Sequence, residues 1–404
     1  MTDHPTVLRL TPAFDWRVVP RAPDHPDSAG GLAVQSALQA TGTARLGVVQ
    51  EVLTMACPGL PRRATVVAGV QLRAVGSGRL DGVHRRNLAW LLGVLVELVR
   101  RRARRPDVVH VHASGLLEPL LAALAARFLL RRPVVLTVHC SAQATYRPQS
   151  RKDEIVQVIT RAAERAAVRR AARTLTLTRR VASVLDGRSQ AMPDWVQVER
   201  FAPDGGITRS RGFAGVHGVP SDTPVVLFIG RISREKGWPA LLAICEATED
   251  LATHLVVCGD GPDLTELQAR VQALGMGRRF TLTGAVSPDE VAAALGCASV
   301  LVLPSAHEEM GSVLVEAMAA GVPSVAYAVG GTSEVIENGV TGMLVADGDE
   351  RGLVSAVRRA IGDPELQACA AQRGPERARA THDAESGARR LVELYRELTS
   401  CEAP

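Results

Sequence analysis

Residues 225–237 read Val-Val-Leu-Phe-Ile-Gly-Arg-Ile-Ser-Arg-Glu-Lys-Gly, and the mainly apolar stretch 238–248 follows them directly. An unbroken apolar run that ends in glycine is typical of a strand buried on both faces, and the stretch after the loop has the length and composition of a helix. A buried strand, a short polar loop and a helix form the repeating unit of parallel α/β sheets. This stretch therefore predicts an α/β fold.

The same alternation of short apolar runs and helical stretches extends over both halves of the chain. The strands expected in the first half are Val7–Leu10, Val48–Met55, Val108–His112 and Val134–His139, and the helices are Leu88–Arg105, Glu118–Leu130 and Ile155–Ala172. The strands expected in the second half are Val225–Ile229, His254–Cys258, Arg279–Leu282, Val300–Leu303, Ser324–Tyr327 and Gly342–Leu344. The helices between them are Trp238–Thr248, Pro262–Leu274, Pro288–Leu295, Val313–Ala320, Ser333–Asn338 and Arg351–Ile361.

The segment Pro203–Pro224 is rich in Gly, Pro, Ser and Asp and has no periodicity, which predicts a linker. We therefore expect two doubly wound, Rossmann-like domains, residues 1–203 and 204–380, that face each other across a cleft. A last helix near Asp383–Leu398, within residues 381–404, is expected to return to the first domain.

The composition argues against several classes of protein. The chain has 404 residues, of which 46% are hydrophobic and 22% charged, as in globular proteins with apolar cores. Its 47 basic and 42 acidic residues are interspersed and only 3% are aromatic, so a nucleic-acid partner is not expected. The longest apolar stretch, 88–99, contains Glu97 and is shorter than the roughly 18–20 residues that span a bilayer, so stable membrane insertion is not expected. The N-terminus lacks the pattern of a signal peptide, which favours a cytoplasmic protein.

Ligands of open α/β sheets bind beyond the carboxyl ends of the strands, so the residues directly after each strand are the most informative. Arg231 and Lys236 lie five residues apart in such a loop, and Lys236 is one of only two lysines in the chain. Two cations beside helix N-terminal amides can bind a diphosphate. Gly261 belongs to a tight turn, Gly259-Asp260-Gly261-Pro262, that lacks the G-x-G-x-x-G spacing of hydride-transfer enzymes.

Two carboxylates eight residues apart form the strongest pattern. Glu308 lies on the loop after an expected strand, and Glu316 lies about one turn inside the next helix. A loop carboxylate can accept hydrogen bonds from sugar hydroxyls, and a helix carboxylate behind it can accept both hydroxyls of a ribose. The backbone amides of Met310 and Gly311 are expected to face the same ligand.

These motifs resemble family 4 of the retaining glycosyltransferases, enzymes of nucleotide sugars with the GT-B fold. The resemblance rests on Gly230-Arg231…Lys236-Gly237, Gly259-Asp260-Gly261-Pro262 and Glu308-x7-Glu316-Ala317-Met318, which occur in this order. It implies that Arg231 and Lys236 bind the donor diphosphate, that Glu308 contacts the transferred hexose and that Glu316 binds the ribose.

The first half of the chain adds two matches to that family. The resemblance implies that the backbone of Gly30 and Gly31 approaches the diphosphate, and that His139 is the cleft histidine near the donor sugar. His139, Arg231, Lys236 and Glu308 are thus the expected catalytic residues. The sequence departs from the family at His139-Cys140, where His-Asp is common. It departs again at Pro193-Asp194-Trp195, where many members have Pro-Asn-Gly, which affects the local hinge geometry.

A narrower resemblance is to the 2-deoxystreptamine glycosyltransferases of aminoglycoside antibiotic biosynthesis. The segments that carry it are Val52-Leu53-Thr54…Pro58-Gly59-Leu60-Pro61-Arg62, Thr137-Val138-His139-Cys140-Ser141…Tyr146-Arg147-Pro148, Gly230-Arg231-Ile232…Gly237-Trp238 and His307-Glu308-Glu309. It implies transfer of N-acetylglucosamine or glucose from a UDP-sugar, as co-substrate, to the aminocyclitol.

The residues favour a mechanism without a metal or another cofactor. The first half offers no clear carboxylate nucleophile, so front-face displacement, in which the leaving phosphate accepts the proton of the acceptor, is expected. Arg231 and Lys236 would stabilise the departing UDP in place of a metal ion. There is no Asp-x-Asp motif at the place where a metal-dependent sugar transferase carries one.

The acceptor is expected to be a dication, and a desolvated ammonium group needs an acidic partner. The candidates for acceptor binding are Asp15, Asp24, Asp27 and Glu118, which lie in or near loops after expected strands. Two alternatives remain open at this point. One is the same donor chemistry on an inositol phosphate or a lipid, and the other is a UDP-sugar-binding protein or epimerase that does not transfer the sugar.

Overall fold

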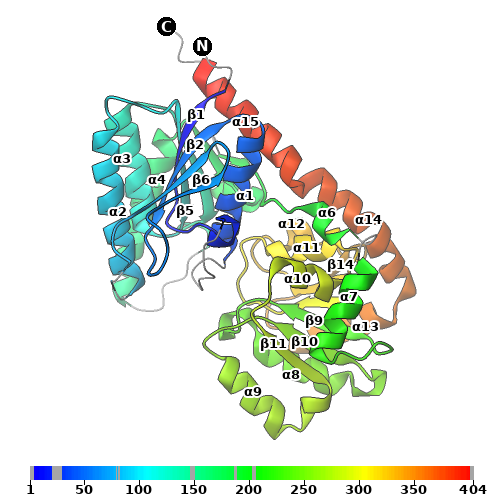
Figure 1. The fold of residues 1–404 in the computed structure, drawn as a ribbon. Helices are drawn as coiled ribbons and strands as arrows, with labels where there is room; N and C mark the ends of the chain where they lie inside the picture. Colours follow the sequence, from blue (N-terminus) through cyan, green and yellow to red (C-terminus); the bar gives the residue numbers. More distant parts are fainter. Residues whose placement is uncertain are drawn as a thin grey trace. The chain divides into compact units, whose positions relative to one another are not determined.

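The computed structural model describes residues 4–20, 30–78, 80, 82–145, 151–185, 189–202 and 206–400. The chain divides into two compact units (Figure 1): unit 1 comprises Met1–Trp195 and Ala384–Pro404, and unit 2 comprises Val196–Asp383. The sequence placed these divisions after residues 203 and 380. Each unit is built on one largely parallel sheet with helices on both faces, so the predicted α/β class with two Rossmann-like sheets is confirmed.

Unit 1 has an eight-stranded sheet in the order β3-β4-β2-β1-β5-β6-β7-β8. Its strands are β1 Thr6–Leu10, β2 Val49–Met55, β3 Arg63–Val67, β4 Val70–Val75, β5 Val108–Ser114, β6 Val134–Cys140, β7 Arg173–Thr176 and β8 Ser189–Ala191. All neighbours are parallel except β3 and β4, which form an antiparallel hairpin. In the centre of the sheet Leu10 is in register with Leu53 of β2 and Val111 of β5.

The helices of unit 1 cover both faces of this sheet. They are α1 Gly31–Arg45, α2 Val83–Arg100, α3 Leu117–Leu130, α4 Arg151–Arg170, α5 Arg179–Val184 and α15 Ala384–Ser400, with a 3-10 helix η1 at Trp16–Val18. Helices α2, α3 and α4 bury Trp90, Leu120 and Val168 against one face. Helices α1 and α15 lie against each other on the other face (Figure 1), where α15 buries Leu391 and Tyr395.

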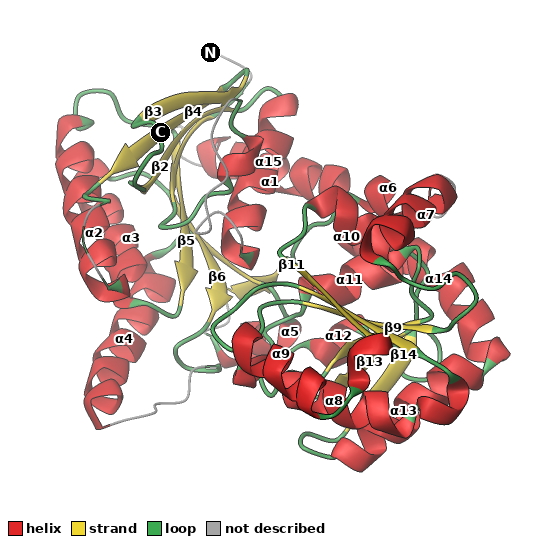
Figure 2. Ribbon diagram, turned by 60° about the horizontal axis from the view of Figure 1, so that its bottom comes forward, coloured by secondary structure: helices red, strands yellow, loops and turns green. Residues whose placement is uncertain are grey.

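Unit 2 has a six-stranded parallel sheet in the order β11-β10-β9-β12-β13-β14. Its strands are β9 Val225–Ile229, β10 His254–Cys258, β11 Phe280–Gly284, β12 Val300–Leu303, β13 Ser324–Tyr327 and β14 Gly342–Val345. Its α-helices are α6 Val198–Phe201, α7 Gly206–His217, α8 Trp238–Ala247, α9 Leu264–Ala273, α10 Pro288–Leu295, α11 Ser312–Ala319, α12 Thr332–Val335, α13 Glu350–Gly362 and α14 Pro364–His382. Among the described residues of this unit there are also the 3-10 helices η4 Arg234–Lys236, η5 Glu249–Leu251 and η6 Met276–Arg278. Helices α8, α9 and α13 share one hydrophobic core against the sheet (Figure 2).

Several elements differ from the prediction. The segment 203–224 is not a plain linker, because α7 begins at Gly206 and ends at His217. Helix α14 was missed because Gly374 and Pro375 lie in its middle and read as a break. A side chain at Gly374 would collide with the carbonyl of Met318, so this glycine lets α14 approach α11 closely. Helix α2 ends at Arg100, five residues earlier than expected.

Trp195 is the last residue of the first segment of unit 1. Its backbone N–H donates to Gln35 Oε1 at 2.9 Å, and its carbonyl accepts from Gln35 Nε2 at 2.7 Å. A Cβ at Gly387 of α15 would lie 2.4 Å from atoms Cε2 and Nε1 of the indole, much closer than van der Waals contact. The buried indole therefore packs tightly on α15, and the two hydrogen bonds tie this part of the backbone to α1.

Every helix among the described residues is too short or too polar to cross a membrane.

Candidate functional site

The carboxyl edge of the unit 2 sheet gathers half of the predicted site residues. The loop after β9 carries Arg231, whose guanidinium is exposed and makes no ion pair within the described part of the chain. Lys236 ends η4 in the same loop, and Gly237, with φ of 75°, starts the turn into α8. Two cations of this loop thus stand at the sheet edge where α/β proteins bind ligands.

Lys236 and Glu308 form an ion pair between the loops after β9 and β12. Lys236 Nζ donates to Glu308 Oε1 at 2.6 Å, and Ser305 Oγ donates to the same oxygen at 3.0 Å. The Glu308 side chain is 11% exposed and that of Lys236 is 25% exposed, so solvent screens this pair only partly. The pair and the buried Ser305 hold the Glu308 carboxylate in one orientation. The sequence pattern showed both charges but not Ser305, because a serine after a strand is too common to signal a contact.

Three glycines bring the backbones of these loops closer together than a side chain would permit. A Cβ would overlap the carbonyl oxygen of Pro304 at Gly237, that of Ile232 at Gly261 and that of Glu308 at Gly330. Gly261 therefore supports the loop of Arg231, and Gly330 supports the loop of Glu308. Gly330 was missed in the sequence, although the pair Gly330-Gly331 soon after β13 was a signal that could have located it.

Met310, Gly311 and Glu316 lie at the start of α11. Met310 is buried, and Gly311, the N-cap with φ of 80°, offers no side-chain acceptor to the first amides of the helix. The amide of Leu314 already donates to the Gly311 carbonyl at 2.9 Å, so the amides that precede it are the ones a ligand oxygen can reach. Glu316 lies in the second turn, where burial raises the pKa of its carboxyl group to about 7 against the opposing effect of Arg200. A carboxyl group with this pKa changes its charge near neutral pH.

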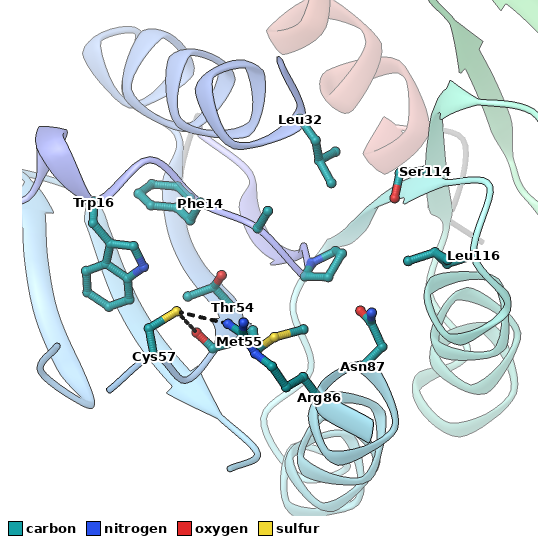
Figure 3. Close-up of a pocket in the computed structure, with 12 residues that line it drawn as sticks. Phe14, Trp16, Leu32, Thr54, Met55, Cys57, Arg86, Asn87, Ser114 and Leu116 are labelled. Atoms are coloured by element: carbon teal, nitrogen blue, oxygen red, sulfur yellow. Dashed lines mark hydrogen bonds between the residues drawn. The ribbon is translucent and has the colours of Figure 1, made fainter. Parts of the chain in front are cut away.

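Unit 1 holds a pocket of about 230 Å³ at the carboxyl edge of its own sheet (Figure 3). Apolar side chains form most of its wall, with polar groups from β2, α2 and the end of β5. The lining residues are Pro12, Ala13, Phe14, Trp16, Leu32, Thr54, Met55, Cys57, Arg86, Asn87, Ser114 and Leu116. The buried hydroxyl of Thr54 has no hydrogen-bond partner among the described residues. A pocket with a mostly apolar wall and a few polar groups is typical of small-molecule binding.

The acids proposed for acceptor binding are not brought together in this pocket. Asp15 caps η1, and its two carboxylate oxygens accept from Arg17 Nε and Nη2, each at 2.9 Å. Glu118 lies in the first turn of α3, not in a loop, and does not line the pocket. Asp24 and Asp27 lie outside the described residues.

Gly30 and Gly31 begin α1, and the described structure does not require glycine at either position. Gly30 is the N-cap with extended backbone, and a Cβ at either residue would meet no described atom within 4 Å. The first turn of α1 therefore has an open backbone.

His139 lies near the end of β6 and is 6% exposed. Its Nε2 lies 2.9 Å from His112 Nδ1, and its Nδ1 lies 3.8 Å from Asp194 Oδ1. Burial, and secondarily the positive charge of Arg9, lower the pKa of His139 to about 3. The imidazole is therefore neutral at physiological pH.

Comparison with known proteins gives consistent matches over the chain. Residues 213–377 match the family model for glycosyl transferases group 1, and residues 29–198 match that for Glycosyltransferase Family 4. A 2-deoxystreptamine N-acetyl-D-glucosaminyltransferase from Streptomyces fradiae is 37% identical over 375 residues, which cover 88% of this chain and 87% of the relative. A 2-deoxystreptamine glucosyltransferase from Streptomyces kanamyceticus is 38% identical, over 82% of this chain and 90% of the relative.

Two further matches bear on acceptor and fold. A D-inositol 3-phosphate glycosyltransferase from Corynebacterium urealyticum is 28% identical over 92% of this chain and 91% of the relative. The structure of sucrose-phosphate synthase from Thermosynechococcus elongatus superposes with a TM-score of 0.82 at 22% identity, covering 98% of this chain and all of that one (100%). The latter shows that the two units have the fold of GT-B enzymes.

Gly330→Ala should destabilise unit 2 more than Gly339→Ala. Both glycines have positive φ, so both substitutions strain the backbone, but only a Cβ at Gly330 meets a backbone atom, the Glu308 carbonyl. We expect Gly330→Ala to reduce the free energy of unfolding by about 1–3 kcal/mol more than the control. Urea unfolding followed by circular dichroism measures the difference, and equal losses in the two variants would contradict the packing argument.

Proposed function

The chain belongs to the family 4 glycosyltransferases with the GT-B fold, and from this premise we propose that it transfers N-acetylglucosamine or glucose from a UDP-sugar to 2-deoxystreptamine. It is a hexosyltransferase related to the 2-deoxystreptamine glycosyltransferases. The observation that carries the proposal is the identity of 37–38% to two such enzymes over more than four fifths of the chain.

The donor is proposed to bind at the carboxyl edge of the unit 2 sheet. Arg231 and Lys236 would bind the diphosphate, with amides at Met310 and Gly311 as further donors. Glu308, oriented by Lys236 and Ser305, would accept hydrogen bonds from the hexose. Glu316 would accept both hydroxyls of the ribose.

The residues of unit 1 are proposed to complete donor binding. The open first turn of α1 at Gly30 and Gly31 would let the diphosphate approach the backbone, which the absence of described atoms near either Cβ position supports. His139 is proposed to lie near the transferred sugar.

The proposed mechanism is a front-face displacement that retains the anomeric configuration and needs no metal ion. The bond between the anomeric carbon and the phosphate oxygen breaks while the acceptor hydroxyl oxygen bonds the same face of that carbon. The acceptor proton passes to the leaving phosphate. Arg231 and Lys236 would stabilise the negative charge that develops on UDP. Burial lowers the pKa of His139 to about 3, which makes this histidine a weak general base and supports proton transfer to the phosphate.

The acceptor is proposed to bind in the pocket of unit 1. Thr54, Asn87 and Ser114 provide polar groups there, and the apolar wall of Phe14 and Leu32 would face the ring of the acceptor (Figure 3). Any carboxylate for the ammonium groups of 2-deoxystreptamine would have to come from outside this lining.

An inositol phosphate is the second candidate acceptor. Arg86 lines the same pocket, and no carboxylate does so within the described part of the chain. A guanidinium there would suit a phosphate group better than an ammonium group. Relatives named D-inositol 3-phosphate glycosyltransferase support this alternative.

The function is tested by incubating the purified protein with each acceptor and with either UDP-N-acetylglucosamine or UDP-glucose. The expected result is a singly glycosylated 2-deoxystreptamine in the mass spectrum, with equal rates in EDTA and in added Mg²⁺ or Mn²⁺. Product only from inositol phosphate would establish the second acceptor. Strict dependence on a divalent metal would refute the metal-free mechanism, and hydrolysis without a glycosylated product would refute transfer.

Lys236→Met should abolish most turnover while the protein stays folded. The substitution removes the cation proposed to stabilise the leaving diphosphate and also frees Glu308, so we expect kcat to fall about 100-fold or more. Arg234→Met is the matched control, because Arg234 lies in the same loop but pairs with Glu266. Near-normal rates in Lys236→Met, or an equal loss in the control, would reject the site.

The affinity for UDP should rise with pH through Glu316. With a pKa of about 7 in the free protein, the carboxylate that accepts ribose hydroxyls is mostly protonated at pH 6 and mostly ionised at pH 8. If only the ionised form binds, the Kd falls about tenfold over this range. Calorimetric titration with UDP at each pH measures the Kd. In Glu316→Gln the Kd should vary with pH only through the titration of UDP itself. The same pH dependence in both proteins would contradict the assignment.

Thr54→Val should raise the KM for the acceptor without a loss of stability. The isosteric change removes a buried hydroxyl that has no partner among the described residues, and with it one proposed hydrogen bond to the acceptor. We expect the KM for the acceptor to rise roughly three- to tenfold. Thr174→Val is the matched control, since its hydroxyl is equally buried and without a described partner but does not line the pocket. An unchanged acceptor KM in Thr54→Val would exclude this contact.

A further inference from the structure

Arg9 of β1 is completely buried in the centre of unit 1, and its hydrogen-bond acceptors among the described residues are all neutral. A guanidinium has five N–H donors and no acceptor, so every group it contacts must accept. The acceptors are Gln50 Oε1 at 3.2 Å from Nε and 3.1 Å from Nη2, Tyr395 OH at 3.1 Å, His112 Nε2 at 2.7 Å, His110 Nδ1 at 3.1 Å and Gln39 Oε1 at 3.3 Å. Arg9 therefore dictates on which nitrogen each of these histidines is protonated.

The tautomer of His112 in turn determines the tautomer of His139. Because His112 Nε2 accepts from Arg9, the proton of the neutral ring must be at Nδ1, which lies 2.9 Å from His139 Nε2. His139 Nε2 then accepts, and its own proton is at Nδ1. Asp194 Oδ1 lies 3.8 Å from this Nδ1, close to the proton but beyond hydrogen-bond distance. We call the row Arg9–His112–His139–Asp194 the histidine relay.

The relay has a cation at one end, a carboxylate at the other and two imidazoles between them. A second proton on either imidazole would be unfavourable. On His112 it would face the guanidinium of Arg9, and on His139 it would face the N–H of His112. The geometry itself thus keeps both rings neutral. Burial and the charge of Arg9 act in the same direction on the pKa values of both histidines.

A second arm of the network obeys the same proton order. His110 Nδ1 accepts from Arg9 and from Tyr395 OH at 2.6 Å, so His110 Nε2 carries the proton and donates to Thr137 Oγ1 at 2.7 Å. Tyr395 of α15 in turn accepts from Arg9. In the part of the chain that the structure describes, the charged or titratable groups that face the relay are Arg9 from β1, His110 from β5, Tyr395 from α15 and Asp194.

We propose that Arg9 is a positioning residue that, through His112, holds His139 as a neutral ring with its proton at Nδ1, so that His139 serves as a hydrogen-bond donor to oxygen and not as an acid or a base. The placement of His139 near the transferred sugar rests on the proposed function. The tautomer itself does not. Because Asp194 Oδ1 is 3.8 Å away, the Nδ1–H group can donate to a sugar hydroxyl oxygen.

The tautomers can be measured directly on the full-length protein without substrate. Two-bond ¹⁵N–¹H correlation spectra of protein labelled with [¹⁵N]histidine distinguish Nδ1–H from Nε2–H, and loss of a signal in His139→Asn and in His112→Asn assigns the two rings. We expect both rings protonated at Nδ1, with no imidazolium from pH 8 to pH 5. A proton at Nε2 of His139, or a charged ring at neutral pH, would overturn the proposal whatever the enzymatic activity is.

Substitution of Arg9 then tests the cause. Lysine also only donates, so Arg9→Lys should retain the Nδ1–H tautomer of His139, whereas glutamine both donates and accepts, so Arg9→Gln should give a mixture of tautomers. With that mixture, kcat/KM for the donor should fall roughly three- to tenfold while the Kd for UDP is unchanged. Tyr395→Phe removes a partner of Arg9 outside the relay and should leave the His139 tautomer unaltered.

A second variant repeats the test with the buried cation intact. His112→Phe removes both the acceptor toward Arg9 and the donor toward His139. A mixture of His139 tautomers is expected. The same His139 tautomer in Arg9→Gln or in His112→Phe as in the native protein would show that the relay does not set it.

Discussion

The proposed donor site of unit 2 depends on close contact between backbones at the carboxyl edge of its sheet. Parallel strands deliver their loops to one edge, where the loops after β9, β10, β12 and β13 compete for the same space. Glycines at 237, 261 and 330 remove the side chains that would keep these loops apart. Only because these loops approach so closely can a lysine of one reach a glutamate of another at 2.6 Å. The ion pair of the site therefore depends on the backbone geometry of these loops.

The sheet of unit 1 contains a buried cation, Arg9 of β1, which must be stabilised without water. An unpaired buried charge costs several kcal/mol, and among its described contacts Arg9 has neutral oxygens and nitrogens instead of a carboxylate. Six hydrogen bonds to five side chains spread this cost over α1, β2, β5 and α15. Gln50 is oriented for its part by two further bonds, to the Ala40 carbonyl and to Thr43. The same network ties α15, the last helix of the chain, into the unit that contains the first strand.

The sequence predicted unit 2 far better than unit 1, and the buried polar residues explain why. Strands of unit 2 are continuous apolar runs, so their periodicity was decisive, and the charged residues after them were found from position alone. Helix α1 was missed because it buries Gln35 and Gln39, which a hydrophobic pattern assigns to the surface. Gln39 can be buried because it accepts a hydrogen bond from Arg9, and Gln35 because it exchanges two hydrogen bonds with the backbone of Trp195. Both partners are distant in the sequence. No local rule reveals such partners, and the same holds for His112 and for the pocket at Thr54.

The carboxylates of the proposed donor site must also be compatible with an anionic ligand. Two acids near a diphosphate would repel it, yet the sugars at its ends require acceptors of hydrogen bonds. The structure shows two different ways to reduce this repulsion. Glu308 is paired with Lys236 and Ser305, so its charge is largely compensated before any ligand arrives. Glu316 has no ion-pair partner within the described part of the chain, and burial raises its pKa to about 7, which leaves about half of the molecules uncharged there at neutral pH. Arg231 makes no ion pair among the described residues, so its positive charge is not compensated. The four side chains include two acids and two bases, yet the carboxyl edge as a whole attracts a diphosphate.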